Sequence, residues 1–276
     1  MSTHDQGQPP ILVVAFEGWN DAGSAATTAV DLLADEWEAD LVDVVDGDGY
    51  YDLQVNRPIV SRDEDGNRII TWPGTDVMLG HLPSGRRVVL MHSVEPSLRW
   101  RSFVEDLLEV ADTYGATEVY TLGALLADVP HTRNLPTNAT SSSSEVRERL
   151  GLRTSEYEGP TGIVGVFDSL ATARGYDAVS LWVSVPHYVS DMPSPKAAAA
   201  LISALAAMLE VPVELPELAE EAERWESAVT ELTSDNPEIE GYVAQLESTR
   251  DAAESAEATG DAIAAEFERY LRRHGK

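Results

Sequence analysis

Short apolar runs alternate with helix-like stretches through most of the chain, from Ile11 to about Pro212. The first run, Ile11 to Phe16, predicts a buried strand, and the stretch from Ser24 to Glu38 carries apolar residues at helical spacing. Strands that alternate with helices build a largely parallel sheet with helices on its faces. The pattern therefore predicts an α/β core domain over residues 11–212.

The same periodicity predicts the remaining elements of this core. We expect strands at Leu41 to Val45, Arg87 to Met91, Glu118 to Leu122 and Val179 to Val185, and helices at Phe103 to Ala111 and Pro193 to Leu209. One segment departs from the alternation, because the runs Ile59 to Ser61 and Arg68 to Trp72 flank a turn centred on Asp65-Gly66. An Asp-Gly turn between two such runs predicts a β-hairpin inserted in the core.

The pattern changes from Glu214 onward, where Ala, Glu and Leu dominate and no strand is predicted. Apolar residues from Leu218 to Leu232 recur at spacings of four and three, which predicts an amphipathic helix. Asn236 and Pro237 fit the N-cap and the first position of a second helix. We therefore expect a C-terminal helical hairpin over residues 213–276 and a disordered N-terminal segment over residues 1–10.

The amino-acid composition limits the kinds of partner and the kinds of site that this protein can have. The chain has 19 basic and 48 acidic residues, a net charge of −29, so nucleic acids and anionic membranes are not expected partners. The absence of cysteine excludes disulfides, thiolate nucleophiles and cysteine-ligated metal sites. No signal peptide and no apolar run of membrane-spanning length are apparent, which predicts a cytoplasmic protein.

Candidate chemistry follows the predicted strands. The turn Gly18 to Gly23 leads into a helix, where backbone amides can bind an anion; alternatively, Asp21 caps that helix. The strand ending at Met91 is followed by His92 and Glu95, an imidazole and a carboxylate that suit acid–base catalysis. Alternatively, Glu95 and the proline after it only start a helix.

Two Val-Pro-His sequences each follow a strand-like run, and they contain His131 and His187. The first lies in Asp128 to Arg133, which gathers an acid, an imidazole and a guanidinium within six residues. Ligands of open α/β sheets bind at the carboxyl ends of the strands, so we expect these turns to converge on one pocket. In the structural alternative, each histidine satisfies a backbone carbonyl and the prolines only shape the loops.

Recognised catalytic signatures are absent. The chain has no Walker loop, no G-x-G-x-x-G, no H-E-x-x-H and no G-x-S-x-G, so neither a metal site nor a cofactor is predicted.

Five motifs together resemble the proteasome assembly chaperone family of the second type. They are Gly18 to Gly23, Glu95-Pro96 with Trp100 and Phe103, Pro130 to Arg133, Tyr157 to Ile163, and Ser180 to Trp182 with Val185 to Tyr188. The resemblance runs from about Ile11 to Leu209, and the tail is similar to the helical extension of actinobacterial members. High arginine and alanine content is consistent with such a source.

The resemblance implies a three-layer α/β fold similar to purine nucleoside phosphorylases, in proteins that form oligomers and help to assemble or bind the 20S proteasome. It implies a homo-oligomer, with a trimer as one candidate, and proteasome subunits as candidate partners. Related chaperones dock through a C-terminal hydrophobic–Tyr–any-residue motif, whereas this sequence ends in Tyr270-Leu271-Arg272-Arg273-His274-Gly275-Lys276. Direct insertion of this tail into a proteasome pocket is therefore not expected.

Two functions remain open. The first is an oligomeric, non-catalytic binding or assembly factor, which the resemblance and the missing catalytic signatures favour. The second is a small-molecule enzyme or sensor for a nucleoside-like or phosphorylated ligand, with Arg133 holding an anion and Glu95 or His131 transferring a proton. The candidate pocket residues are Trp19, Asp21, Glu95, His131, Arg133, Thr161, His187 and Tyr188.

Overall fold

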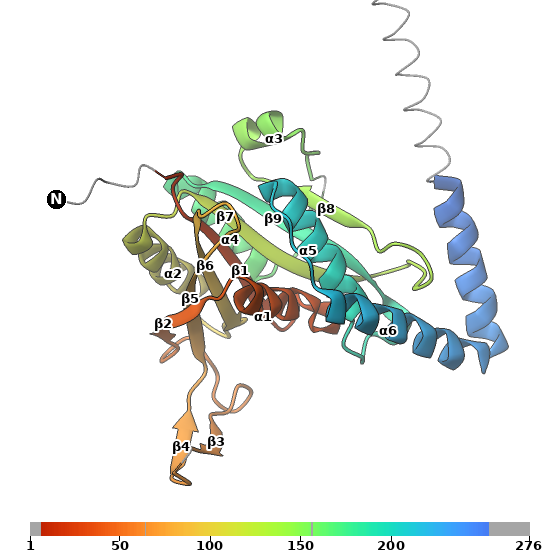
Figure 1. Ribbon diagram of the computed structural model, residues 1–276, viewed down its shortest axis with the longest axis horizontal. Coiled ribbons are helices and arrows are strands. Elements are labelled where there is room, and N and C mark those ends of the chain that lie inside the picture. The colour runs from red at the N-terminus through yellow and green to blue at the C-terminus, as the bar shows by residue number, and fades with distance from the viewer. Residues whose placement is uncertain (1–6, 64, 156, 254–276) are drawn as a thin grey trace, which may run out of the picture.

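A sheet of seven strands forms the middle layer of the protein (Figure 1). The computed structural model describes residues 7–63, 65–155 and 157–253. Across the sheet the strands are β2 (Asp40–Asp46), β5 (Gly74–His81), β6 (Arg87–Val94), β1 (Ile11–Glu17), β7 (Glu118–Ala127), β9 (Asp177–Pro186) and β8 (Thr137–Thr140). The four strands β6, β1, β7 and β9 run parallel, and β5 and β8 pair antiparallel with their neighbours. The predicted, mainly parallel α/β sheet is confirmed.

Two strands of the sheet were not predicted. β5 returns directly from the hairpin segment, and its sequence mixes Thr, Asp, Gly and His among the apolar residues. β8 has the sequence Thr-Asn-Ala-Thr, which carries no hydrophobic alternation. Each of these strands is defined by its backbone hydrogen bonds to a neighbouring strand. The spacing of apolar residues in the sequence does not predict such pairing.

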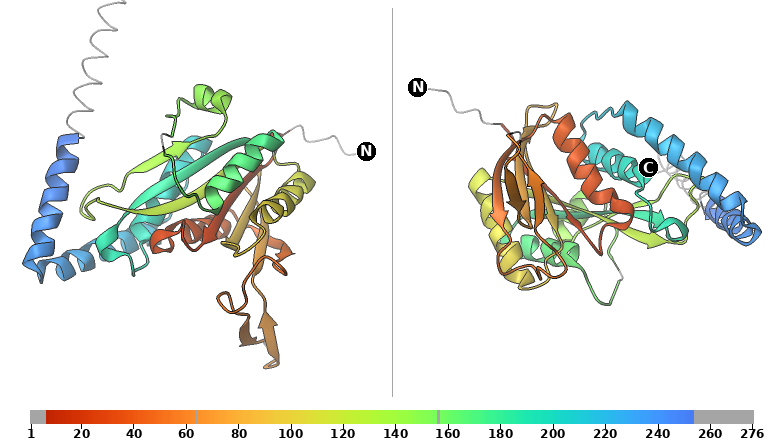
Figure 2. Two further views of the ribbon diagram at one scale, coloured as in Figure 1. Left: turned by 180° about the vertical axis from the view of Figure 1, so that it is seen from behind. Right: turned by 90° about the horizontal axis from the view of Figure 1, so that it is seen from below.

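Helices cover both faces of the sheet, which completes the predicted three-layer arrangement (Figure 2). On one face lie α1 (Ala25–Glu36) and α5 (Pro195–Leu209), and on the other lie α2 (Trp100–Tyr114) and α4 (Ile163–Arg174). The short helix α3 (Ser144–Leu150) follows β8.

The protein has two hydrophobic core clusters, one on each face of the sheet, and the central strand β1 contributes side chains to both. All its residues from Ile11 to Phe16 are buried. Because side chains alternate across a strand, Ile11, Val13 and Ala15 pack with α1 and α5, whereas Leu12, Val14 and Phe16 pack with α2 and α4. A continuous apolar run is therefore the sequence that a strand between two helical layers requires.

The predicted hairpin is present, and it projects away from the sheet (Figure 1). Its strands β3 (Ile59–Arg62) and β4 (Arg68–Thr71) pair only with each other among the residues that the structure describes. In the turn, Asp63 Oδ1 accepts a hydrogen bond of 2.7 Å from the Asn67 amide. We call this hairpin the arm.

Beyond α5, α6 (Pro216–Ser234) packs on α5, and a further helix occupies residues 237–253 (Figure 2). As predicted, Asn236 begins the second helix, since its Oδ1 accepts from the Glu238 amide at 3.0 Å. The part of the predicted hairpin after residue 253 and most of the predicted N-terminal segment lie outside the described residues. Within the described part of the chain, no helix combines the length and apolar character needed to cross a bilayer.

An ion cluster fastens α1 to the sheet. His92 on β6 lies 2.7 Å from Asp31 of α1 through Nδ1 and 3.1 Å from Glu17 of β1 through Nε2. The hydrogen bond to Asp31 outweighs the effect of burial and raises the pKa of His92 from 6.5 to about 9. The imidazole is therefore charged in the folded protein at neutral pH.

Replacing this histidine should change how stability depends on pH. Because the folded-state pKa is the higher one, the charged imidazole stabilises the fold fully below pH 6.5, and this contribution disappears as the pH rises through about 9. His92→Gln should lower the free energy of unfolding by about 1 to 2 kcal/mol below pH 6.5, since both carboxylates are half exposed and partly screened. Urea unfolding of wild type and variant across this pH range measures the difference.

The matched control is His81→Gln, which alters an exposed histidine at the end of β5. A His92 effect that stays constant from acid to alkaline pH would contradict the electrostatic origin.

Candidate functional site

The turn after β1 is held by its own side chains. Asp21 accepts hydrogen bonds from the Ala26 amide at 2.6 Å and from the Thr27 hydroxyl at 2.5 Å, so it caps the start of α1. Burial raises the pKa of Asp21, although these donors oppose the shift. The backbone of the same turn joins the sheet, since the Ala124 amide donates to the Asn20 carbonyl at 2.7 Å.

Glu95 connects this turn to the other helical layer. Its Oε1 accepts from the Asn20 side-chain amide at 2.9 Å and from the backbone amide of Ile163, the first residue of α4, at 3.0 Å. A carboxylate at a helix N-terminus satisfies an orphan amide and complements the helix dipole. Glu95 is thus a positioning residue for the turn and for α4.

These segments border a pocket of about 1050 Å³. Its walls come from the turn Gly18–Gly23, the start of α4 and the loop before it, and its floor from β8 and β9. Trp19, Asp21 and Thr161 line the pocket, and Glu95 adjoins it through its two hydrogen bonds. The described lining residues include no Lys, Arg or His.

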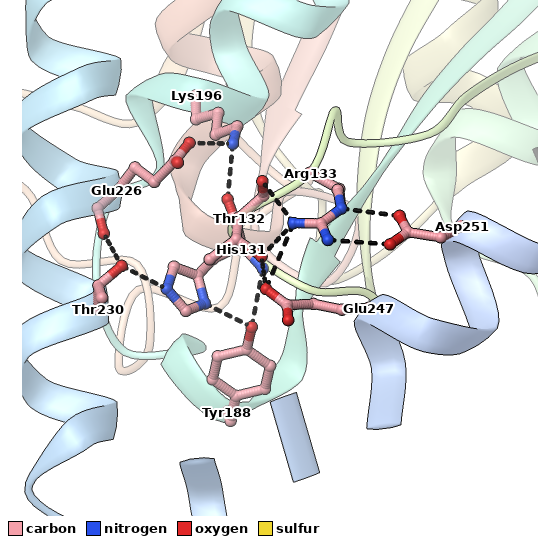
Figure 3. Close-up of polar contacts among 9 residues, drawn as sticks. All are labelled: His131, Thr132, Arg133, Tyr188, Lys196, Glu226, Thr230, Glu247 and Asp251. Carbon is pink, nitrogen blue, oxygen red and sulfur yellow. Dashed lines mark hydrogen bonds and ion pairs between the residues drawn. The ribbon is translucent and has the colours of Figure 1, made fainter. Parts of the chain in front are cut away.

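Three further predicted residues, His131, Arg133 and Tyr188, lie beside the helical extension, which consists of α6 and the helix at 237–253 (Figure 3). His131 is 1% exposed, and both of its ring nitrogens are engaged. Tyr188 Oη lies 2.8 Å from Nδ1 and also accepts from the His131 backbone amide. Nε2 lies 3.0 Å from Thr230 Oγ1 on α6, whose own proton goes to the Glu226 carbonyl. Nε2 therefore carries a proton and donates it to Thr230.

Burial lowers the pKa of His131 and thereby favours a neutral ring. Lys196 also lowers this pKa, whereas Glu226 and Glu247 oppose the shift. Lys196 donates to the His131 carbonyl at 2.6 Å and pairs with Glu226 (Figure 3). His131 is therefore used in fastening α6 to the end of the sheet.

Arg133 fastens the next helix, at residues 237–253, to the same loop. Its guanidinium forms a bidentate pair with Asp251, at 2.8 and 3.0 Å, and lies 3.4 Å from Glu247 (Figure 3). Thr132 also donates to Glu247. The loop 131–133 thus binds residues of both α6 and the helix at 237–253.

The second Val-Pro-His sequence lies beside this network. His187 pairs with Asp128 at 3.2 Å, and Asp128 also accepts from Tyr242 at 3.0 Å. The rings of His187, Tyr188 and Tyr242 meet edge to face. The contacts of Tyr242 with Asp128, His187 and Tyr188 connect these strand ends to the helix at 237–253.

The structure therefore does not bring the eight predicted residues together in one pocket. Trp19, Asp21, Glu95 and Thr161 lie at the pocket, whereas His131, Arg133, His187 and Tyr188 lie at the joint with the extension. The physical reason is that the acidic extension supplies Glu226, Glu247 and Asp251 as partners for the cations. The proton-transfer group and the anion-holding group of the catalytic hypothesis are thus committed to other contacts.

Asp168 lines the pocket from α4 and is 6% exposed, and it was not among the predicted residues. It interrupts an apolar helical run, and a lone acid in such a run was the available signal.

Comparisons with known proteins identify relatives of most of the chain. A model of the PAC2 family matches residues 15–233. A crystal structure of a PAC2 family protein from Streptomyces avermitilis is 45% identical, with a TM-score of 0.80 over 85% of this chain and 99% of that one. A proteasome-assembly chaperone homologue from Mycobacterium tuberculosis is 44% identical, with a TM-score of 0.76 over 84% of this chain and 99% of that one.

More distant structures share the fold. An archaeal proteasome activator from Pyrococcus furiosus is 15% identical, with a TM-score of 0.67 over 83% of this chain and 96% of that one. No curated protein matches the chain.

The Arg133 contacts should hold the helix at 237–253 in place. Arg133→Ala removes a bidentate ion pair that is worth about 1 kcal/mol at a partly exposed site, so amide hydrogen exchange in residues 237–253 should accelerate about fivefold. Exchange in the central strands should not change. Hydrogen–deuterium exchange with mass spectrometry measures both.

Arg224→Ala is the control, because it removes an exposed pair with Glu220 within α6. Equal exchange in the two variants would show that the Arg133 pair does not hold the helix.

Proposed function

The chain belongs to the PAC2 family, and from this premise we propose that it is an oligomeric, non-catalytic factor that binds and assembles proteasome subunits. The observation that carries the proposal is the 44% identity to a proteasome-assembly chaperone homologue over 84% of this chain. At this identity the two chains share the fold, with a TM-score of 0.76.

The division of the predicted catalytic groups supports a non-catalytic role. General acid–base catalysis needs a proton-transfer group within hydrogen-bond reach of the substrate. His131 is buried between Tyr188 and Thr230, and Arg133 is paired with Asp251. Neither is among the residues that line the pocket.

The arm supports self-association. Its exposed apolar side chains include Ile59 at 68%, Ile70 at 51% and, just after β4, Trp72 at 59%. An isolated two-stranded hairpin is marginally stable in water, and contiguous exposed apolar surface marks interaction sites. A second copy of the chain that packs on the arm stabilises the hairpin and buries its apolar side chains.

The edge of the sheet next to the arm also exposes apolar side chains. β2 is the last strand of the sheet, and Leu41, Val42 and Val44 on it are 44 to 60% exposed. An uncovered edge strand with apolar side chains is a template for unwanted pairing. The arm and β2 together form the surface that we propose is buried between subunits.

The alternative function, a small-molecule enzyme or sensor, has one specific observation in its favour, which is the 1050 Å³ pocket at the strand ends. Among the described residues that line this pocket there is no cation for a phosphorylated ligand.

Charged residues on the arm should break the oligomer. Val60 and Ile70 are cross-strand partners on one face of the arm, and Ile59 and Ile69 lie on the opposite face. Burial of such side chains contributes about 1.5 kcal/mol or more each, so replacing the interface pair by Asp should raise the dissociation constant about a hundredfold. Light scattering and sedimentation of the variants Val60→Asp/Ile70→Asp and Ile59→Asp/Ile69→Asp measure the loss.

Leu150→Asp is the control, since Leu150 is 40% exposed at the end of α3, away from the arm. If wild type is a monomer, or if both double variants keep the wild-type mass, the arm is not an interface.

Proteasome assembly tests the proposed function directly. Purified 20S α and β subunits from the same organism should form an intermediate that contains this protein, and mature particles should appear faster in its presence. Native mass spectrometry and the rate of peptidase activity report the two effects. An arm variant that is monomeric should lose the acceleration, whereas Leu150→Asp should retain it. Unchanged kinetics and no complex would refute an assembly role.

A further inference from the structure

One face of the arm combines apolar and basic side chains. Val60 and Ile70 are cross-strand partners, and Arg62 and Arg68 form a further cross-strand pair. Because side chains alternate along a strand, these two pairs lie on the same face. All four residues are exposed. In a chain with a net charge of −29, this face therefore offers an apolar pair beside two guanidinium groups.

The two arginines have no carboxylate partner within the arm. Arg62 donates to the Gly66 carbonyl at 2.8 Å, and neither guanidinium forms an ion pair with residues 7–63, 65–155 or 157–253. Asp63, which follows Arg62 in the sequence, accepts from Asn67 through both of its oxygens. Like charges directly opposite each other, as in Arg62 and Arg68, destabilise a pair of strands. Carboxylates from outside the arm would therefore stabilise it.

The edge of the sheet at β2 carries the complementary groups. Val45 packs with the core cluster on the α2 side, so its neighbours Val44 and Asp46 lie on the α1 side. Asp76 of β5 is the cross-strand partner of Val44 and lies on that side as well. All three of these α1-side residues are exposed. Asp46 Oδ1 accepts from the Asp48 amide at 2.9 Å, which leaves Oδ2 for a partner.

Charge selects the way in which two copies of the chain can meet. Contact between two β2 edges would bring carboxylates together, and contact between two arms would bring guanidinium groups together, and both arrangements are repulsive. Contact between an arm and a β2 edge instead pairs opposite charges and places apolar side chains against apolar side chains.

The backbone also suits this contact. β2 is the last strand of its sheet, and β3 and β4 form a sheet of only two strands (Figure 1). Each of these strands therefore has one side whose backbone groups make no strand pairing within the described ranges. A hairpin that lies along such an edge can extend the sheet of its partner.

We infer that the arm of one copy lies against the β2 edge of a second copy, with Arg62 and Arg68 paired to Asp46 and Asp76. The inference rests on the proposed self-association and specifies which surface of one copy meets which surface of the next. Because the arm and the edge are different surfaces of one chain, two copies exchange arms or several copies close a ring. In both cases every arm and every edge is covered.

Charge reversal on one surface should break the oligomer. Arg62→Glu/Arg68→Glu and Asp46→Lys/Asp76→Lys each bring like charges into contact, so each should raise the dissociation constant at least about a hundredfold. The variant with all four changes reverses both surfaces and should regain a dissociation constant within about tenfold of wild type. Sedimentation velocity measures association, and circular dichroism shows that each variant is folded.

A neutral variant separates the interface from the hairpin itself. Arg62→Gln/Arg68→Gln removes the repulsion between the two guanidinium groups, so a role confined to the arm predicts association that is unchanged or tighter. The interface role predicts a dissociation constant that is about tenfold higher, because two ion pairs between subunits are lost.

The matched controls are Arg153→Glu/Arg224→Glu and Arg153→Gln/Arg224→Gln. They make the same charge changes at two exposed positions, after α3 and on α6, that belong to neither surface. Both controls should associate as wild type does.

An equimolar mixture of the two charge-reversed double variants gives a second test of rescue, should the variant with four changes fail to fold. The acidic arm of one variant then meets the basic edge of the other, so the mixture should associate although neither variant does so alone. Association of the mixture supports the pairing.

The failure of this inference differs from the failure of the proposed self-association. If Val60→Asp/Ile70→Asp dissociates the oligomer while the arginine and aspartate variants keep the wild-type mass, the arm is an interface but the pairing with β2 is wrong. The pairing is also wrong if neither the four-change variant nor the mixture associates. A monomeric wild type would refute both proposals.

Discussion

One carboxylate oxygen joins three parts of the chain that are distant in sequence. Glu95 Oε1 accepts from Asn20 after β1 and from the amide of Ile163 at the start of α4, while the Glu95 backbone amide donates to the Glu17 carbonyl at 2.8 Å. Because the oxygen has two acceptor positions and both are used, the turn and the helix must lie at a fixed separation. The wall of the pocket and the placement of Asp168, five residues further along α4, depend on this contact.

The helical extension is held in place by side chains whose types and spacing in the sequence suggest catalysis. Acid, imidazole and guanidinium within six residues suit an active site, and the same groups suit a joint between two acidic helices and the end of a sheet. His131, Arg133 and Lys196 are met by Thr230, Asp251 and Glu226 (Figure 3). In a chain with a net charge of −29, Arg133 and Lys196 have many carboxylates available as partners, and the extension brings some of these carboxylates close.

The molecule therefore separates its surfaces by chemistry. The arm and the edge strand β2 carry exposed apolar side chains, which suit a protein partner. The opposite end of the sheet, at β8 and β9, carries small polar side chains that border the pocket.

The sequence by itself determined the elements whose residues are buried on a regular period. The apolar run of β1, the helical spacing of α1 and α5, the Asp-Gly turn of the arm and the Asn236 cap were all predictable, because each depends on residues close in sequence. Tertiary structure alone decided that β5 and β8 are strands, since their hydrogen bonds come from neighbours and not from their own pattern. It also decided that His131 and Arg133 face α6 and the helix at 237–253, about a hundred residues further along the chain, while Asp21 and Glu95 stay at the pocket. The spacing of residues along the chain shows which side chains follow a strand. The partner of each such side chain depends on which helix packs against that end of the sheet, and this is decided by tertiary structure.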